Sequence, residues 1–390
     1  MLARIALILA VLASPLVAQT FDTRAEAAYV VDQRTGAVLL SKNAEEPLPP
    51  ASMSKLMTLF MTFEAIQRGV LSVTDELPVS TYAAGRGGST MFLDSRDRVS
   101  VEDLIRGIIV LSGNDACIVL AEALSPDGTE AGFARIMTAR ARELGMQNST
   151  FMNSTGWPAA GHLMSMKDLA ILTDRLIRDF PTFYPLFAEE EFAFDGRAPS
   201  NTRNRNPVLG RGIGADGLKT GHTEEAGYGL TGSARQGDRR IIFVVTGLET
   251  QAQRAEEAER IVNWAFRQFA ETVAAPAGTR LSEAEVHMGA SRRVGLTTAE
   301  DVMVLVPTIG AGEITAHANY DSPLEAPIAA GDVLGELVVE IPGFEPTRTP
   351  LIAAEAVDVG GFVPRLRTAA EALRRQFLEN GVLGTADPAS

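Results

Sequence analysis

The period of the hydrophobic pattern changes near residue 217 of this 390-residue chain. Before that point two short apolar runs predict a β-hairpin, and most later apolar residues recur at helical spacing. After it, three runs predict consecutive strands and a helical segment closes the region. Strands, then helices, then an antiparallel run favour an α+β domain over a doubly wound sheet. The expected segments are the hairpin 27–32 and 37–41, helices 52–63, 101–110, 115–123, 131–144 and 166–177, strands 217–223, 227–234 and 240–247, and helix 255–269.

A run of small residues around a proline, 274–278, predicts a linker to a second region. Short strand-like runs separated by turn residues follow this linker. They predict a small all-β sandwich of roughly 80 residues. The runs lie at 283–287, 302–307, 313–318, 333–340 and 351–357.

The two ends of the chain predict export and attachment to a membrane. Residues 1–18 have a basic start, an apolar run too short to span a bilayer and a small final residue, which is the layout of a secretory signal peptide. Residues 361–380 show helical spacing of apolar residues and carry four arginines against two glutamates. They predict an amphipathic helix on a membrane surface, with docking on the protein's own surface as the alternative. We expect 381–390 to be disordered.

The composition excludes several classes of protein. A formal charge of −14 argues against nucleic-acid binding, because no basic excess exists to neutralise phosphates. The only cysteine, Cys117, cannot form an internal disulfide and is typical of a small buried residue rather than a nucleophile. The four histidines have no metal-ligand spacing, and the sequence assigns no chemistry to His162, in a predicted loop. We therefore expect neither a metal nor an organic cofactor.

Arginine supplies almost all of the positive charge. Of the 35 lysines and arginines, only Lys42, Lys55, Lys167 and Lys219 are lysine. Lysine can give up its proton and arginine cannot, so a lysine retained in such a chain points to proton transfer. Two of the four stand in sequences that suggest chemistry, Ser52-Met53-Ser54-Lys55 and Lys219-Thr220-Gly221.

The first of these sequences predicts a nucleophile and its base. On a helix Ser52 and Lys55 share one face and lie within hydrogen-bonding reach. The helix N-terminus favours an alkoxide, and burial lowers the pKa of a lysine, so an uncharged Lys55 can take the proton of Ser52. The alternative is a capping serine followed by a solvated lysine. The rest of the helix is apolar and predicted to be buried, which argues against a lysine exposed to solvent there.

Two further motifs complete what acyl transfer at a peptide carbonyl requires. Ser112-Gly113-Asn114 falls in a turn between two predicted helices, and Lys219-Thr220-Gly221 opens a predicted strand. Either alone is an ordinary turn or strand edge. In this order the three motifs supply a nucleophile, a base, a proton relay, an amide clamp and a strand that faces a carboxylate.

These motifs resemble those of the low-molecular-mass penicillin-binding D-alanyl-D-alanine carboxypeptidases, which are serine peptidases. The runs PPASMSKLMT, LIRGIIVLSGNDA, ARELGMQNSTFMNSTG and DGLKTGHTEEAGYGLTGSA match as well, and the resemblance covers essentially the whole chain. It implies a β-lactamase/transpeptidase-like catalytic domain over 22–272, with an antiparallel sheet flanked by helices. A β-rich domain over 279–358 and an anchor helix over 361–380 would follow. The family's anchor helix usually ends the chain, whereas ten residues follow it here.

The resemblance also implies a role for each matching residue. Ser52 would attack the carbonyl between two D-alanines, Lys55 would take its proton, and Ser112 would pass a proton to the leaving D-alanine. The backbone N–H groups of Ser52 and His222 would form the oxyanion hole. The expected substrate-binding residues, of which the two arginines match positions near the terminal carboxylate, are Asn114, Lys219, Thr220, Gly221, His222, Arg205 and Arg254.

The implied activity is removal of the terminal D-alanine from peptidoglycan stem peptides by a periplasmic enzyme attached peripherally to the cytoplasmic membrane. β-Lactams would trap Ser52 as a slowly hydrolysed ester. A β-lactamase or an esterase on the same fold and a non-catalytic cell-wall-binding homologue are the alternatives. Class A β-lactamases add a glutamate for deacylation. No matching glutamate motif is found here, and Ser-Gly-Asn replaces their Ser-Asp-Asn.

Overall fold

The computed structural model describes residues 21–310, 312–362 and 370. The chain divides into two compact units, one formed by residues up to 269 with 307–310 and the other by 270–306 with the residues from 311 onward. The predicted signal peptide, the predicted tail and all but residues 361, 362 and 370 of the predicted terminal helix lie outside the described residues. Of the helices that are described, none is both long and apolar enough to span a bilayer.

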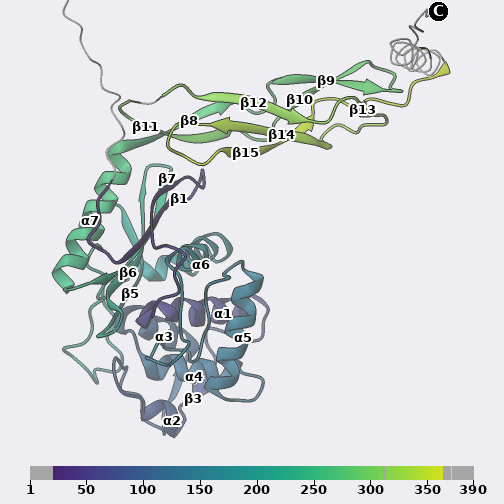
Figure 1. The fold of residues 1–390 in the computed structure, drawn as a ribbon. Helices are drawn as coiled ribbons and strands as arrows, with labels where there is room; N and C mark the ends of the chain where they lie inside the picture. Colours follow the sequence, from purple (N-terminus) through teal and green to yellow (C-terminus); the bar gives the residue numbers. More distant parts are fainter. Residues whose placement is uncertain (1–20, 311, 363–369, 371–390) are drawn as a thin grey trace, which may run out of the picture. The chain divides into compact units, whose positions relative to one another are not determined.

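The first unit is built on a five-stranded antiparallel sheet in the order β2-β1-β7-β6-β5 (Figure 1). The predicted hairpin and the three later strands are all confirmed. Strand β5 forms one edge of the sheet, so one side of its backbone can pair with another chain. The strands are β1 (Ala27–Asp32), β2 (Val38–Lys42), β5 (Ala215–Thr223), β6 (Gly227–Gln236) and β7 (Arg239–Leu248).

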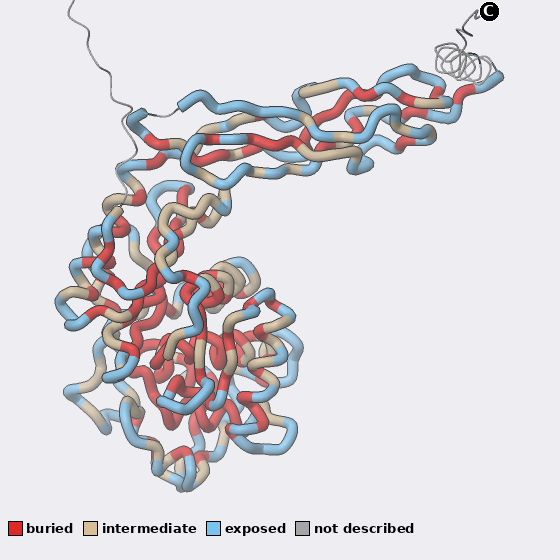
Figure 2. Tube along the Cα trace, viewed as in Figure 1, coloured by how far each residue is buried: buried red, intermediate tan, exposed pale blue. Residues whose placement is uncertain are grey.

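Helices cover both faces of this sheet. Along β7, Ile242 and Val244 point into a large helical core, whereas Phe243 and Val245 pack with the helix that follows the sheet. This alternation is the period of two expected of a strand buried on both faces. The confirmed α+β unit is buried through its centre (Figure 2). Helix α7 (Gln251–Gln268) packs on one face, and α6 (Met166–Asp179) packs on the other. The helices that share the apolar core on the α6 side are α1 (Lys55–Gln67), α3 (Val101–Arg106), α4 (Asn114–Leu124) and α5 (Glu130–Glu143).

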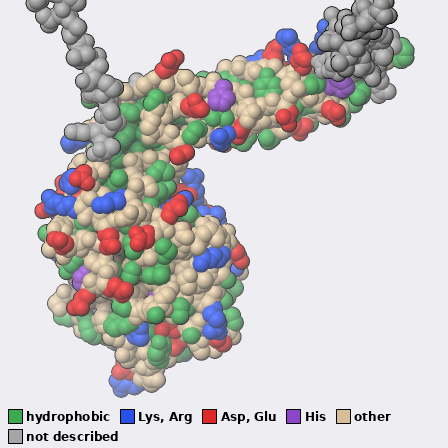
Figure 3. Space-filling model, viewed as in Figure 1, with side chains coloured by type: hydrophobic (Ala, Val, Ile, Leu, Met, Phe, Trp, Pro, Cys, Tyr) green, Lys and Arg blue, Asp and Glu red, His purple; other side chains and the backbone are tan. Residues whose placement is uncertain are grey.

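Short elements complete the first unit. Strands β3 (Glu76–Pro78) and β4 (Arg98–Ser100) form a two-stranded sheet, and α2 (Thr81–Ala84) lies between them in sequence. Acidic and basic side chains are interspersed on the visible face of this unit, without one large basic patch in that view (Figure 3).

Two predicted helices differ from the structure where the motifs lie. The segment expected to be helical from Ser52 begins as a 3₁₀ turn, η1 (Ala51–Ser54), and α1 starts only at Lys55. The helix expected over 101–110 ends at Arg106 and continues as a π-helical turn, η2 (Gly107–Leu111). Helix α4 then begins at Asn114, which shortens the predicted turn. In both places the regular α-helix is interrupted within a candidate motif. π-Helical turns are frequent at functional sites.

The second unit consists of two sheets around one apolar core, as the predicted sandwich requires. Six strands pair in the order β12-β14-β15-β10-β9-β13, and β11 pairs with β8. The sequence pattern missed β8, β10 and β13, and β8 includes the first two residues of the predicted linker. The strands are β8 (Phe269–Ala275), β9 (Ser282–His287), β10 (Arg293–Thr297), β11 (Val302–Pro307), β12 (Thr315–Tyr320), β13 (Leu324–Glu325), β14 (Val333–Glu340) and β15 (Thr347–Ala353).

Candidate active site

The predicted nucleophile and base are in direct contact. Lys55 Nζ donates to Ser52 Oγ at 2.7 Å and to the carbonyl oxygen of Thr155 at 2.7 Å. Ser52 lies in the 3₁₀ turn η1, and Lys55 follows it as the first residue of α1. Side chains at i and i+3 lie on one face in either geometry, so this turn keeps the amine and the hydroxyl together.

Burial prepares Lys55 to act as a base. Its side chain is fully buried, and burial lowers the pKa of the ammonium from 10.5 to about 8, helped by the positive charge of Arg205. A lysine with a pKa near 8 is partly uncharged at neutral pH. When Lys55 is uncharged, the same 2.7 Å contact lets the Ser52 hydroxyl donate its proton to the amine.

The loop that holds Lys55 is fixed against the nucleophile turn. The side-chain oxygen of Asn153 accepts hydrogen bonds from the N–H groups of Thr155, Gly156 and Trp157, which orients the Thr155 carbonyl toward Lys55. Gly156 has a φ of +78° and packs against the peptide between Ala51 and Ser52. A Cβ on Gly156 would lie 1.8 Å from the Ala51 carbonyl oxygen and 3.2 Å from the Ser52 nitrogen.

We expect Gly156→Ala to destabilise the protein and to displace Ser52. The left-handed backbone costs an alanine about 1 kcal/mol, and the overlap with Ala51 adds about 1–3 kcal/mol. Thermal unfolding measures the sum, and the rate of penicillin labelling measures the displacement. Gly145→Ala is the matched control, because Gly145 has a φ of +89° but a Cβ added to it would have no atom within 4 Å. Equal losses in the two variants would contradict the proposed close packing.

The third motif lies beside the first. Gly221 in β5 faces the nucleophile turn so closely that a Cβ there would lie 2.9 Å from the Pro50 carbonyl oxygen and 3.2 Å from the Ala51 Cβ. Glycine is therefore required for strand β5 to reach the turn. The next residue, His222, is exposed and belongs to the same edge strand of the sheet.

The second motif has an unusual backbone. Ser112 follows the π-helical turn and adopts a left-handed conformation with φ 63° and ψ 33°, although its side chain is buried. Non-glycine residues in this region are uncommon and often occur at functional sites. Asn114 donates its side-chain N–H to the Gly87 carbonyl and its backbone N–H to the Ser89 carbonyl, both at 2.8 Å. The second motif is thus joined to the loop around residues 87–89.

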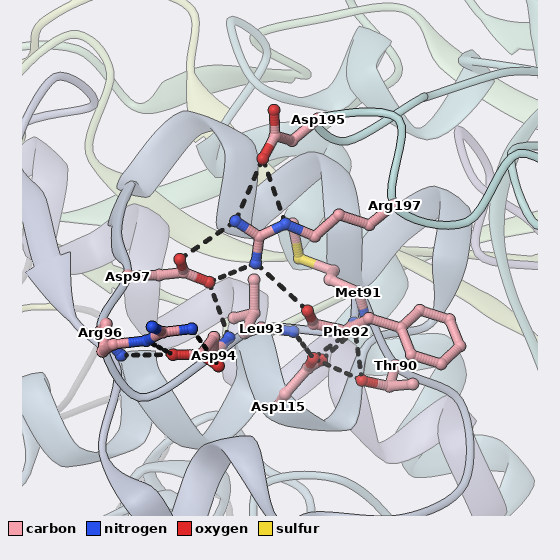
Figure 4. Close-up of polar contacts among 10 residues, drawn as sticks. All are labelled: Thr90, Met91, Phe92, Leu93, Asp94, Arg96, Asp97, Asp115, Asp195 and Arg197. Carbon is pink, nitrogen blue, oxygen red and sulfur yellow. Dashed lines mark hydrogen bonds and ion pairs between the residues drawn. The ribbon is translucent and has the colours of Figure 1, made fainter.

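The buried carboxylate of Asp115 holds the continuation of that loop (Figure 4). It accepts hydrogen bonds from the backbone N–H groups of Met91 and Leu93 and from the Thr90 hydroxyl. The sequence pattern indicates no role for this residue, although it directly follows the Ser-Gly-Asn motif. Farther along the loop, Asp97 forms an ion pair with Arg197. Arg197 precedes Arg205 in the same chain segment.

Four cations gather at the site. Burial, and after it the positive charges of Lys55, Arg205 and Arg254, lowers the pKa of Lys219 well below 10.5. Burial, the main cause, and Arg205 also lower the pKa of Arg254 to about 10. Within the described part of the chain none of the four forms an ion pair, and the Nε atom of Arg254 is buried without a hydrogen-bond partner. Such a group of cations favours the binding of an anion.

Hydrogen bonds fix the two predicted arginines and the lysine of the third motif. Arg205 donates to the Ser89 hydroxyl at 2.6 Å, so it belongs to the same loop network as Asn114. An Nη atom of Arg254 lies 3.5 Å from the Arg205 carbonyl oxygen. Lys219 donates to the Thr220 carbonyl at 3.1 Å, and both side chains are buried. The predicted site residues on separate elements are therefore linked from Asn114 through Ser89 to Arg205 and Arg254.

An aromatic ring supports two of the predicted residues. His222 lies over the ring of Tyr228, its partner on β6, with centroids 3.8 Å apart. The Arg254 guanidinium lies 5.6 Å from the centre of the same ring. Tyr228 thus positions both side chains. The sequence signal that could have found it is its register opposite the Lys-Thr-Gly strand.

His162 is a second residue whose role the sequence pattern does not indicate. Its Nδ1 accepts from the Met152 N–H, so its Nε2 carries the proton and donates to the Ser54 hydroxyl at 2.8 Å. Burial, and secondarily Lys55, lowers its pKa to about 4, so the ring is neutral at pH 7. His162 therefore positions the nucleophile turn through its hydrogen bond to Ser54. Cys117 is buried, as expected, and burial raises the pKa of its thiol to about 12.

The fold is that of a penicillin-binding protein. The solved structure of penicillin-binding protein 5 from Haemophilus influenzae superposes with a TM-score of 0.78 at 32% identity, covering 86% of this chain and 98% of that one. The family model for D-alanyl-D-alanine carboxypeptidase matches residues 14–250, and the model for the penicillin-binding protein 5 C-terminal domain matches 269–359. The chain belongs to the D-alanyl-D-alanine carboxypeptidase family.

Two further comparisons extend over different parts of the chain. The D-alanyl-D-alanine carboxypeptidase DacC of Escherichia coli K12 is 38% identical over 353 residues, which are 88% of this chain and 86% of that protein. Penicillin-binding protein D2 of Listeria monocytogenes, solved in an ampicillin-bound form, is 32% identical with a TM-score of 0.56 and covers 63% of this chain. That alignment covers 98% of the Listeria chain.

Proposed function

We propose that this protein is a serine DD-carboxypeptidase that removes the terminal D-alanine from peptidoglycan stem peptides. The observation that carries the proposal is the 2.7 Å contact of a buried lysine, whose pKa is lowered to about 8, with the Ser52 hydroxyl, beside three further basic side chains. The contact provides an activated nucleophile, and the cations provide a place for a terminal carboxylate. Family membership supports the same activity.

Acylation begins with proton transfer. Uncharged Lys55 takes the hydroxyl proton of Ser52 as Oγ attacks the carbonyl carbon between the two D-alanines. The backbone N–H groups of Ser52 and His222 would hold the resulting oxyanion. The close approach of Gly221 to Ala51 supports this pairing, because it brings the two backbones together.

The leaving group then departs and water completes the reaction. Ser112 would pass the proton gained by Lys55 to the nitrogen of the leaving D-alanine, while the peptide bond breaks and the ester to Ser52 remains. Water hydrolyses this ester and restores the Ser52 hydroxyl. Asn114 would hold the substrate amide, and its fixation by Gly87 and Ser89 supports a positioning role.

The terminal carboxylate of the substrate would lie at Thr220, Lys219, Arg205 and Arg254. An anion placed there reduces the mutual repulsion of these cations and gives the buried Nε of Arg254, which has no hydrogen-bond partner, a group to bind. A peptide with a C-terminal amide lacks that charge. The site therefore supports a carboxypeptidase acting at a free C-terminus.

A direct comparison of two reactions separates the proposal from its alternatives. We expect rapid release of D-alanine from diacetyl-Lys-D-Ala-D-Ala and slow turnover of penicillin. Fast penicillin turnover without D-alanine release would indicate a β-lactamase instead. A protein that neither releases D-alanine nor takes up labelled penicillin would be a non-catalytic homologue.

The family also supports a location outside the cytoplasm, where peptidoglycan lies. We further propose a catalytic domain over 22–272, a β-rich domain over 279–358 and peripheral attachment to the cytoplasmic membrane through a basic amphipathic helix over 361–380. The support for attachment is the sequence pattern of that segment.

Deleting residues 361–390 should move the enzyme from the membrane fraction to the soluble fraction. Activity on small peptides should persist, because the proposed catalytic residues all precede residue 255. Fractionation followed by a D-alanine release assay on both fractions tests this expectation. Unchanged fractionation would discard the anchor.

A further inference from the structure

A cleft lies next to the nucleophile but does not include the residues proposed to hold the terminal carboxylate. It has a volume of about 330 Å³ and is lined by, among others, Pro50, Ala51, Trp157, Pro158, Thr223 and Glu225. Ala51 precedes Ser52 and Thr223 follows His222, so the cleft begins beside the two residues proposed to form the oxyanion hole. We name it the acyl-side cleft.

The direction of β5 orders the parts of a bound substrate. Thr220, proposed to bind the terminal carboxylate, precedes His222 on this edge strand, and Thr223 follows it. At ~3.3 Å per residue, Thr223 lies ~10 Å from Thr220, the span of about three residues of an extended peptide. A substrate paired with the edge of β5 would therefore place its two D-alanines before the cleft and the preceding residue at it.

The lining of the cleft has an apolar wall and one charged end. Pro50, Ala51 and Pro158 contribute aliphatic surface, and Trp157 contributes an aromatic ring against which the Arg86 guanidinium lies at 4.8 Å. Among the described residues that line the cleft, Glu225 has the only carboxylate. It lies in the turn between β5 and β6, is exposed, and has no ion-pair partner within the described chain. His162 also lines the cleft but is neutral at pH 7, because its pKa is about 4, and does not repel a cation.

We propose that the acyl-side cleft binds the side chain of the residue that precedes the two D-alanines, and that Glu225 selects a side chain with an aliphatic stem and a terminal ammonium. The stem would pack on the prolines, and the ammonium would pair with the Glu225 carboxylate. This inference rests on the proposed carboxypeptidase activity and adds to it a specificity-determining residue of this chain, Glu225.

The test compares two peptides that differ only in this charge. Acetyl-Lys-D-Ala-D-Ala carries a free ε-ammonium, and diacetyl-Lys-D-Ala-D-Ala carries a neutral ε-amide. For the unmodified enzyme at low salt we expect kcat/KM to be ~3-fold higher for the charged peptide, the size of one solvent-accessible ion pair. The ratio should fall toward one in about 0.5 M NaCl, because salt screens such a pair.

Two variants assign the preference to one carboxylate. Glu225→Gln should reduce the ratio to about one, and Glu225→Arg should reverse it. Glu224→Gln is the matched control, because it removes the same charge from the adjacent turn residue, which does not line the cleft, and it should keep the ratio of the unmodified enzyme.

Each outcome decides between the two proposals. If neither peptide releases D-alanine, the proposed function fails. If both are hydrolysed equally by the unmodified enzyme, the function stands and the role of the cleft is overturned. The role of Glu225 is also overturned if the ratio persists in Glu225→Gln, or if Glu224→Gln loses it to the same extent.

Discussion

Replacing Ser52 with alanine is expected to abolish covalent labelling by a fluorescent penicillin and all release of D-alanine. No other group can take its place, because the Oγ atom is the one that Lys55 contacts at 2.7 Å. Gel fluorescence measures the labelling, and mass spectrometry of the unmodified protein should find the adduct on the peptide that contains Ser52.

Ser54→Ala is the matched control for this variant. Ser54 lies two residues away in the same turn, is buried, and bonds to His162 rather than to Lys55. We expect it to label at Ser52 but more slowly, because it loses only the His162 bond that positions the turn. An adduct at another residue, or full labelling of Ser52→Ala, would refute the assignment of the nucleophile.

Lys55→Arg is expected to lower the acylation rate by about 10²–10⁴-fold although it keeps the positive charge. Arginine does not release its proton near neutral pH, so the variant has a cation but no base. Burst kinetics with a chromogenic penicillin measure acylation directly. Lys167→Arg, at an exposed ion pair with Glu45, should acylate normally. A near-normal rate for Lys55→Arg would remove Lys55 from the role of base.

The pH profile of the unmodified enzyme provides a second measurement of the same group. The uncharged fraction of Lys55 grows as the pH rises through its pKa of about 8. Acylation should therefore increase with pH and level off above that value. A rate that falls as the pH rises through this pKa would contradict a lysine base.

Much of the architecture follows from the sequence because its signals are local. The strands at 217–223, 227–234 and 240–247 show the β pattern, and their turns carry glycine, so neighbouring segments determine their pairing. The contact of Ser52 with Lys55 also depends on only four consecutive residues. These features need no knowledge of distant parts of the chain.

Other features depend on contacts that no local pattern records. The hydrogen bond between His162 and Ser54 joins residues that are 108 positions apart in the sequence, and the one between Arg205 and Ser89 joins residues 116 positions apart. The left-handed Ser112 depends on the π-helical turn before it, which a helical pattern cannot distinguish from an ordinary turn of α-helix. Strand β13, two residues long, is too short to show any alternation.

The way Asp115 holds its loop has a consequence for how freely that loop can vary in sequence. A carboxylate that bonds to main-chain N–H groups does not depend on the side chains of the residues it fixes. Phe92, which is exposed, can therefore be exchanged while the loop stays in place, whereas Met91 and Leu93 are buried in the core and are constrained by packing. We expect related sequences to vary at the exposed position and to retain Asp115.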